Sequence, residues 1–232
     1  MTTGELIGSG RTADVFALDG DWVLRRYRDA VDASPEAALM RRLAARGYPV
    51  PEVRPGTYAK GDLVMRRVTG PTMSRAMLDG SLEVAEAAAL LADLLHRLHT
   101  LPVTDTVPGH RQLHLDLHPE NVLLGPRGPV VIDWQNAATG PPSLDWALSA
   151  LIMAQVAVSL TERTGAVEEF LRLLLAAGPS GIASQLPRAR RRRARDPMAR
   201  PEELTALDAA VDRVVAALPS GADGYDPGRH AQ

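Results

Sequence analysis

Residues 114–134 read HLDLHPENVLLGPRGPVVIDW, and this stretch decides the fold class. It places Asp116 five residues before Asn121, and Asp133 follows two short hydrophobic runs. The runs, Val-Leu-Leu and Val-Val-Ile, are separated by Gly-Pro-Arg-Gly-Pro, which predicts a β-hairpin. A strand end and an adjacent loop can then bring Asn121 and Asp133 to one ion.

The residue types in this stretch suit phosphoryl transfer. One carboxylate must receive or orient the hydroxyl proton of the acceptor molecule. An amide oxygen and a second carboxylate must hold magnesium, a hard ion that prefers oxygen ligands and bridges nucleotide phosphates. An aspartate, an asparagine and a second aspartate after a hairpin form such a set in the order that this chemistry uses.

The pattern His-x-Asp-Leu-His-Pro-x-Asn, hairpin, Ile-Asp-Trp resembles the aminoglycoside phosphotransferase-like family, the small-molecule branch of the protein-kinase-like fold. The resemblance covers roughly residues 4–160 with the motifs in the family's order. It implies that Asp116 is the catalytic base and that Asn121 and Asp133 bind magnesium together with ATP. It also implies that His114 braces the catalytic loop and that Asp145 is structural.

Near the start of the chain, Gly8-Ser9-Gly10 and Val15 match the kinase glycine-rich loop, with Ala13 in place of its third glycine. Glycines let a backbone approach phosphates closely. The motif precedes a predicted strand rather than a helix, which disfavours a dinucleotide-binding fold, and no P-loop sequence is present. We therefore expect Gly8, Ser9, Gly10 and Val15 to contact the nucleotide.

The predicted third strand departs from the family pattern, because it carries arginine where the resemblance leads us to expect lysine. Arg25 and Arg26 are both candidates for this cation. Alternation places Arg25 on the same face as Val23, which the resemblance places against adenine. Glu36 falls on the apolar face of the next predicted helix, where it needs a partner, and we expect it to pair with the arginine.

The strand Leu63-Val-Met-Arg-Arg-Val68 occupies the place of the hinge between lobes in the family. The resemblance implies that backbone groups there bind the adenine edge, so we include Arg66 and Val68 among the expected nucleotide contacts.

The fold class that follows is α+β: a two-lobed protein-kinase-like fold with a small β-rich N-lobe and a helical C-lobe that carries the short catalytic hairpin. The expected domains are an N-terminal nucleotide-binding lobe over residues 1–70, a helical catalytic lobe over 71–218 and a loosely ordered tail over 219–232. The helical lobe is expected to contain helices over residues 81–100, 144–177 and 201–218.

Composition limits the function classes. The 232 residues include no cysteine, which excludes disulfides and thiolate metal sites, and the formal charge of −2 gives no reason to expect nucleic acid or an anionic membrane as a partner. The first residues lack the pattern of a signal peptide, so a cytoplasmic protein is expected. The oligomeric state, monomer or homodimer, stays open.

The expected function is ATP- and magnesium-dependent transfer of the γ-phosphoryl group to a hydroxyl of a small molecule. Two alternatives stay open: an atypical minimal protein kinase, and a nucleotide-binding regulator without catalysis. The run Arg188–Arg195 holds six arginines in eight positions. It is interpreted as a solvated or disordered connector in preference to a binding surface for an anionic substrate or partner.

Overall fold

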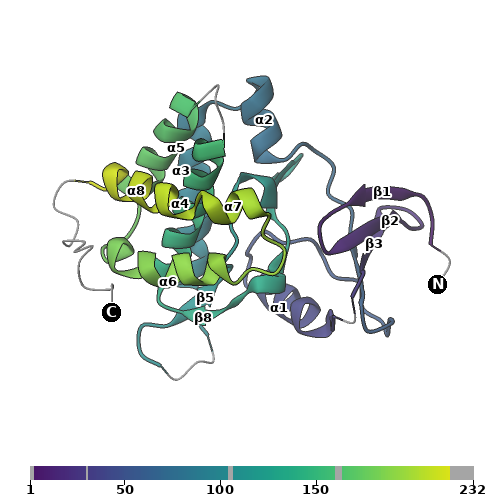
Figure 1. The fold of residues 1–232 in the computed structure, drawn as a ribbon. Helices are drawn as coiled ribbons and strands as arrows, with labels where there is room; N and C mark the ends of the chain where they lie inside the picture. The colour runs from purple at the N-terminus through teal and green to yellow at the C-terminus, as the bar shows by residue number, and fades with distance from the viewer. Residues whose placement is uncertain (1–2, 30, 104–106, 160–163, 220–232) are drawn as a thin grey trace. The chain divides into compact units, whose positions relative to one another are not determined.

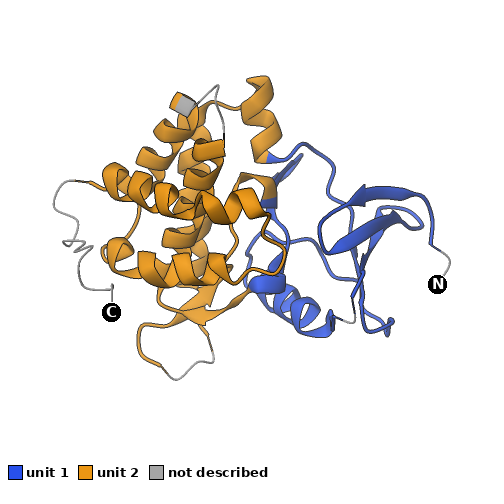
Figure 2. Ribbon diagram, in the orientation of Figure 1, with its two compact units in different colours: residues 1–72, 121–136 blue, residues 73–120, 137–232 orange. Residues whose placement is uncertain are grey.

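The computed structural model describes residues 3–29, 31–103, 107–159 and 164–219 (Figure 1). The backbone forms two compact units: the first contains residues 1–72 and 121–136, and the second contains residues 73–120 and 137–232 (Figure 2). A strand-rich beginning with one helix precedes a helix-rich remainder, as the sequence predicts. The predicted lobe boundaries stay predictions, and residues 220–232 of the expected tail lie outside the described residues.

The first unit is built on an antiparallel sheet in the order β1-β2-β3-β4. Its strands are β1 (Leu6–Ser9), β2 (Ala13–Ala17), β3 (Trp22–Tyr27) and β4 (Asp62–Arg66). The turn between β2 and β3 passes through Gly20 at φ 64°, a left-handed conformation that glycine adopts without strain. Val15 lies directly opposite Arg25, so these side chains share one face of the sheet.

Helix α1 (Ser34–Ala44) follows the sheet strands β1 to β3 in the chain and buries Leu39, Met40 and Leu43. The residue at its N-cap position is Ala33, and no side chain caps the helix there. The Ser34 backbone N–H donates to Asp32 Oδ1 at 2.9 Å.

The predicted hairpin forms from β6 (Val122–Gly125) and β7 (Gly128–Val131). It belongs to the first compact unit, although the sequence assigned it to the helical lobe. Backbone bonds explain this: the Leu124 N–H donates to the Pro71 carbonyl at 2.9 Å, and the Val131 N–H donates to the Pro49 carbonyl at 2.8 Å. The short helix η2 (Trp134–Asn136) follows the hairpin and contacts α1.

The second unit is a helical assembly around α4 (Pro142–Ser159), which is buried on almost every side. Helices α5, α6 and α8 pack against α4, and α3 packs against α5. The bounds of the other elements are α2 (Met73–Asp79), α3 (Val84–Thr100), β5 (Arg111–Leu113), β8 (Ala138–Gly140), α5 (Thr164–Ala176), α6 (Ile182–Ala194), α7 (Pro201–Thr205) and α8 (Leu207–Ala217). Among the described helices, none is both long enough and apolar enough to cross a bilayer.

Three helical predictions need correction, and one of them is the helix expected over 201–218, which is divided at Ala206 into α7 and α8. The run expected over 144–177 is divided into α4 and α5, and residues 160–163 between them lie outside the described part of the chain. The arginine-rich run 188–195 is not a disordered connector, because residues 182–194 form helix α6. Its apolar side chains supply the reason: Ile182, Leu186 and Ala189 are buried, so packing holds a segment that its charge alone would leave solvated.

Candidate active site

The loop that carries Asp116 is held by the fully buried carboxylate of Asp145, from the first turn of α4. Asp145 accepts hydrogen bonds from the His114 N–H at 2.9 Å and the Leu115 N–H at 2.6 Å. His99 of α3 brings its Nε2 to 3.0 Å from the same carboxylate, so three donors converge on Asp145. The structural role that the resemblance implied for Asp145 is therefore visible as a clamp on the loop that carries Asp116.

This clamp holds an unusual backbone. Leu115, immediately before Asp116, has φ 65°, and Asp133 has the same value. Among the described residues these are the two non-glycine positions with positive φ. An L-residue adopts this region at a cost of order 1 kcal/mol, so surrounding bonds must enforce it. Both strained positions therefore lie at or beside residues that the sequence singled out for chemistry.

The choice between the two arginines of β3 is settled by their partners. Arg25 Nη1 donates to Glu36 Oε1 at 3.2 Å, and Arg25 Nη2 donates to Asp133 Oδ1 at 2.7 Å. Arg26 lies on the other face of the strand and binds Asp62 through two bonds of 2.8 Å. The expected pair with the glutamate of α1 is therefore made by Arg25.

Glu36 is the centre of a buried polar cluster. Its carboxylate accepts bonds from the Tyr27 hydroxyl and from the Trp134 backbone N–H, in addition to Arg25. These bonds explain why a glutamate is tolerated at 6% exposure on the apolar face of α1. The Tyr27 contact was not predicted, although strand alternation already placed Tyr27 on the same face as Arg25.

The charges of this cluster are shifted by burial and by one another. Burial raises the pKa of the Glu36 carboxyl, and the opposing effect of the Arg25 guanidinium does not cancel it. Burial alone would lower the pKa of Arg25, but the carboxylates of Asp133 and Glu36 reverse this and raise it. Burial, followed by the charge of Glu36, also raises the pKa of the Tyr27 hydroxyl. Arg25 is therefore a permanent cation, and Tyr27 a permanent hydrogen-bond donor, at neutral pH.

The two expected metal ligands flank the hairpin within the first unit. Asn121 precedes β6 and is 8% exposed, and the Ile132 N–H donates to its backbone carbonyl at 3.0 Å. Asp133 follows Ile132, so the pairing of β6 with β7 brings both residues to the same end of the hairpin. Their side chains offer the oxygen donors that magnesium prefers, and one or two protein ligands completed by phosphate oxygens are usual for this ion. The donor set therefore fits magnesium.

The glycine-rich motif forms the turn between β1 and β2, where the Gly10 N–H donates to the Ala13 carbonyl at 2.9 Å. A Cβ atom at Gly8 would meet Val15 at 3.7 Å and one at Gly10 would meet the Ala13 carbonyl at 3.5 Å, both ordinary contacts. The fold itself therefore does not require glycine at either position. The Ser9 hydroxyl is engaged with Asp14, which Arg28 also binds.

The remaining expected nucleotide contacts differ in how they are placed. Val23 is buried on the Arg25 face of the sheet. Arg66 lies opposite Trp22, and its guanidinium stacks on that ring at 4.5 Å. The Arg66 backbone N–H already donates to the Glu52 carbonyl at 2.8 Å. Any adenine contact at Arg66 must therefore use its carbonyl, and Val68 is the neighbouring candidate on the same connection.

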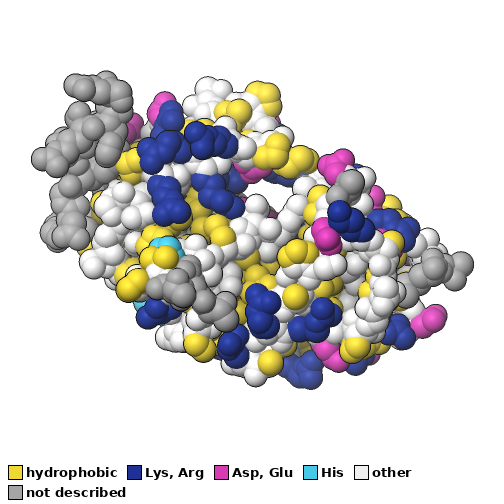
Figure 3. Space-filling view, turned by 90° about the horizontal axis from the view of Figure 1, so that it is seen from below, with side chains coloured by type: hydrophobic (Ala, Val, Ile, Leu, Met, Phe, Trp, Pro, Cys, Tyr) yellow, Lys and Arg dark blue, Asp and Glu magenta, His cyan; other side chains and the backbone are white. Residues whose placement is uncertain are grey.

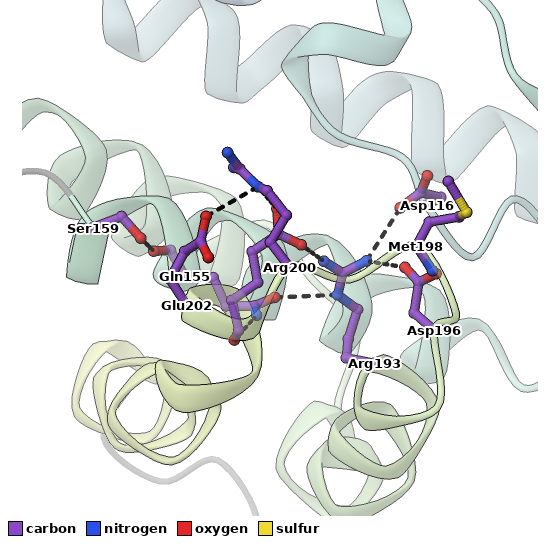
Figure 4. Close-up of polar contacts among 9 residues, drawn as sticks. Asp116, Gln155, Ser159, Arg193, Asp196, Met198, Arg200 and Glu202 are labelled. Atoms are coloured by element: carbon purple, nitrogen blue, oxygen red, sulfur yellow. Dashed lines mark hydrogen bonds and ion pairs between the residues drawn. The ribbon is translucent and has the colours of Figure 1, made fainter. Parts of the chain in front are cut away.

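Sequence reasoning missed one residue beside Asp116, the predicted catalytic base. Arg193 of α6 brings Nη1 to 3.9 Å from Asp116 Oδ1, within the second unit (Figure 4). The arginine run was noticed, but its composition indicated solvation. Helical periodicity could have identified Arg193 as an inward-facing residue, because buried Leu186 and Ala189 lie on the same side of α6 as Arg193.

Comparison with known proteins identifies the family and the fold class of the chain. The model of the family described as "Phosphotransferase enzyme family" matches residues 3–113 and 106–183. No curated protein sequence matches the chain.

Among solved structures, a thermostable mutant of aminoglycoside phosphotransferase APH(4)-Ia, in ternary complex with AMP-PNP and hygromycin B, aligns with TM-score 0.64 and 16% identity over 95% of this chain and 94% of that one. ADP-bound aminoglycoside phosphotransferase APH(2'')-Ib aligns with TM-score 0.60 and 14% identity over 94% of each chain. Choline kinase LicA from Streptococcus pneumoniae aligns with TM-score 0.53 and 13% identity over 93% and 94%. At these identities the likeness concerns the fold, and it confirms the predicted protein-kinase-like α+β class.

Proposed function

Because the chain belongs to the phosphotransferase enzyme family, we propose that it transfers the γ-phosphoryl group of ATP to a hydroxyl group of a small molecule. The observation that carries the proposal is the Asp116 loop, with its strained backbone at Leu115 clamped by the buried Asp145. A buried carboxylate that fixes one short loop is expected where the side chain that follows, here that of Asp116, must be held in a defined orientation.

Each part of the site has a role in this proposal. Asp116 accepts the proton of the acceptor hydroxyl as its oxygen attacks phosphorus, and the bond from phosphorus to the leaving oxygen of ADP breaks. Asn121 and Asp133 hold magnesium, which, when bound, neutralises charge on the phosphate oxygens. Arg25 gives the phosphates a fixed cation, while Glu36 and Tyr27 keep it in place.

The nucleotide roles are assigned to the first unit. The backbone at Gly8, Ser9 and Gly10 covers the phosphates, which explains glycines that the fold itself does not require. Val15 and Val23 contact the adenine ring, and backbone groups at Arg66 and Val68 bind its edge. We propose a small-molecule alcohol as the acceptor and the cytoplasm as the compartment.

The first test measures ADP release with Mg-ATP against a panel of hydroxyl compounds: hygromycin B, gentamicin, choline, homoserine and simple sugars. We expect magnesium-dependent turnover with at least one of them. Asp116→Ala should reduce kcat by at least about 100-fold, because it removes the proton acceptor. Turnover that survives in Asp116→Ala would contradict the assigned role. A parallel reaction with ATP labelled in its γ-phosphate shows which molecule receives the phosphoryl group, and labelled protein in place of labelled small molecules would favour a protein kinase.

A matched pair of substitutions on β3 tests the proposed role of Arg25 in nucleotide binding. Arg25→Met should raise KM for ATP about tenfold or more, because it removes the buried cation beside Asp133. Arg26→Met removes the neighbouring arginine, which binds Asp62 on the opposite face, and should leave KM for ATP unchanged. Equal effects of the two substitutions would contradict the assignment of Arg25 to the phosphates.

A further inference from the structure

The arginine side chains of helix α6 point in two directions. Arg188, Arg191 and Arg195, spaced along one stripe of the helix, are exposed to solvent. Figure 3 shows Lys and Arg side chains gathered on this face of the helical unit. Arg193 points the other way, and its side chain is only 13% exposed. The arginine run therefore contains one member that the fold places inside the second unit.

The guanidinium of Arg193 is fixed from several elements (Figure 4). Its Nε–H donates to Gln155 Oε1 of α4 at 3.1 Å, and its Nη1 donates to Asp196 Oδ2 at 3.2 Å. Its Nη2 lies 3.7 Å from Glu203 Oε2 of α7. A long side chain held at three of its nitrogens keeps one position, so the charge beside Asp116 is part of the built site.

The carboxylates around Arg193 share two guanidinium groups. Arg193 faces Asp116, Asp196 and Glu203, while Arg200 Nε donates to Glu203 at 3.0 Å and lies 3.5 Å from Glu202. The outer carboxylates are thus paired with Arg200 as well as with Arg193. Arg193 places a fixed positive charge 3.9 Å from Asp116 Oδ1, and a cationic acceptor that reacts at Asp116 would have to approach this charge.

The Arg193 guanidinium also has hydrogen-bond donors that could bind the substrate that accepts the phosphoryl group. Of its five N–H groups, two make hydrogen bonds among the described residues, to Gln155 and Asp196. The contacts to Asp116 at 3.9 Å and to Glu203 at 3.7 Å are longer than hydrogen bonds. The donors that remain suit hydroxyl or carboxylate oxygens of a molecule whose reacting hydroxyl lies at Asp116.

We infer that Arg193 is a specificity-determining residue that selects an uncharged or anionic alcohol as the phosphoryl acceptor and disfavours acceptors with a cationic group near the reacting hydroxyl. The inference rests on the proposed function, because it takes Asp116 as the place where the hydroxyl reacts. A like charge held beside the reacting group disfavours cations through repulsion in a partly buried site.

The test compares acceptors of matched shape and different charge by Mg-ATP-dependent ADP release. Glucose, glucosamine and glucuronate form one series, and choline with its uncharged carbon isostere forms a second. The proteins are the wild type, Arg193→Gln, Arg193→Lys and Arg190→Gln. Arg190 is the matched control, because it lies on the same helix but pairs with the exposed Asp208. Thermal unfolding confirms that each variant is folded.

We expect the wild type to prefer the uncharged or anionic member of a series by at least about tenfold in kcat/KM. Arg193→Gln should lose most of this preference, whereas Arg193→Lys, which keeps the charge, and Arg190→Gln should retain it. Preference for the cationic members, or a ratio unchanged in Arg193→Gln, would overturn the inference and leave the phosphotransferase proposal standing. Absence of ADP release with every alcohol and with water would instead overturn the proposed function and the inference with it.

Discussion

Asp145→Asn isolates the clamp on the catalytic loop, because it keeps the shape of the side chain and changes one oxygen into an NH₂ donor. In the wild type, Oδ2 accepts from the His114 N–H and faces His99, while Oδ1 accepts from the Leu115 N–H. Whichever oxygen is replaced, at least one backbone N–H then faces another donor. The group is fully buried, so water cannot compensate for the loss.

The magnitude follows from these three bonds. A hydrogen bond to a charged group contributes about 1.5–3 kcal/mol, and the bonds that remain become neutral and weaker. We therefore expect Asp145→Asn to lower the free energy of unfolding by about 2–4 kcal/mol. The lost bond is that of the Leu115 N–H if the amide replaces Oδ1 and that of the adjacent His114 N–H if it replaces Oδ2, so in both cases the backbone that holds Leu115 at φ 65° loosens and ADP release should fall as the Asp116 loop relaxes.

Urea unfolding followed by circular dichroism measures the change in free energy, with Asp208→Asn as the control. Asp208 is an exposed helical aspartate that pairs with Arg190, and its substitution should change stability by no more than about 0.5 kcal/mol. If Asp145→Asn is as stable as this control and equally active, the reasoning about the clamp is refuted.

Two further predictions concern the first unit. Gly70→Ala should destabilise the protein by about 3 kcal/mol or more, because φ is 141° and the new Cβ would lie 2.0 Å from the Leu124 carbonyl oxygen. The control Gly128→Ala, at φ 111° with open space around the new Cβ, should destabilise the protein by only about 1–2 kcal/mol. Equal losses of stability in urea unfolding would contradict the steric argument. Glu36→Gln should change the pH dependence of stability: burial raises the folded-state pKa of this carboxyl, so its stabilising effect is complete below its ordinary value of 4.5 and declines as pH rises through the folded-state value. The stability of the wild type relative to Glu36→Gln should therefore fall as pH rises above 4.5, and a rising difference would show that Arg25 outweighs burial.

The hairpin that joins the proposed site residues was predictable, because these residues follow one another along the chain. Asp116, Asn121 and Asp133 are separated only by a loop and a hairpin, and short apolar runs around Gly-Pro turns specify a hairpin locally. Glu36 was likewise visible, since a charge at an apolar helical position requires a partner.

Contacts between distant segments were not predictable in the same way. The choice of Arg25 over Arg26 depended on which face of β3 meets α1, and the segment 188–195 became helical because buried neighbours outweighed its charge. Arg193 stands 77 positions after Asp116 in the chain, and only the packing of α6 against α4 brings its guanidinium to that carboxylate.

The sequence by itself thus determined the reaction class, because the motif residues Asp116, Asn121 and Asp133 lie close together in the chain and are recognisable from their order and spacing. The tertiary structure alone decided which charge lies beside Asp116. Such a charge depends on long-range packing of helices, and an arginine in a run of arginines looks the same in sequence whether it faces solvent or Asp116.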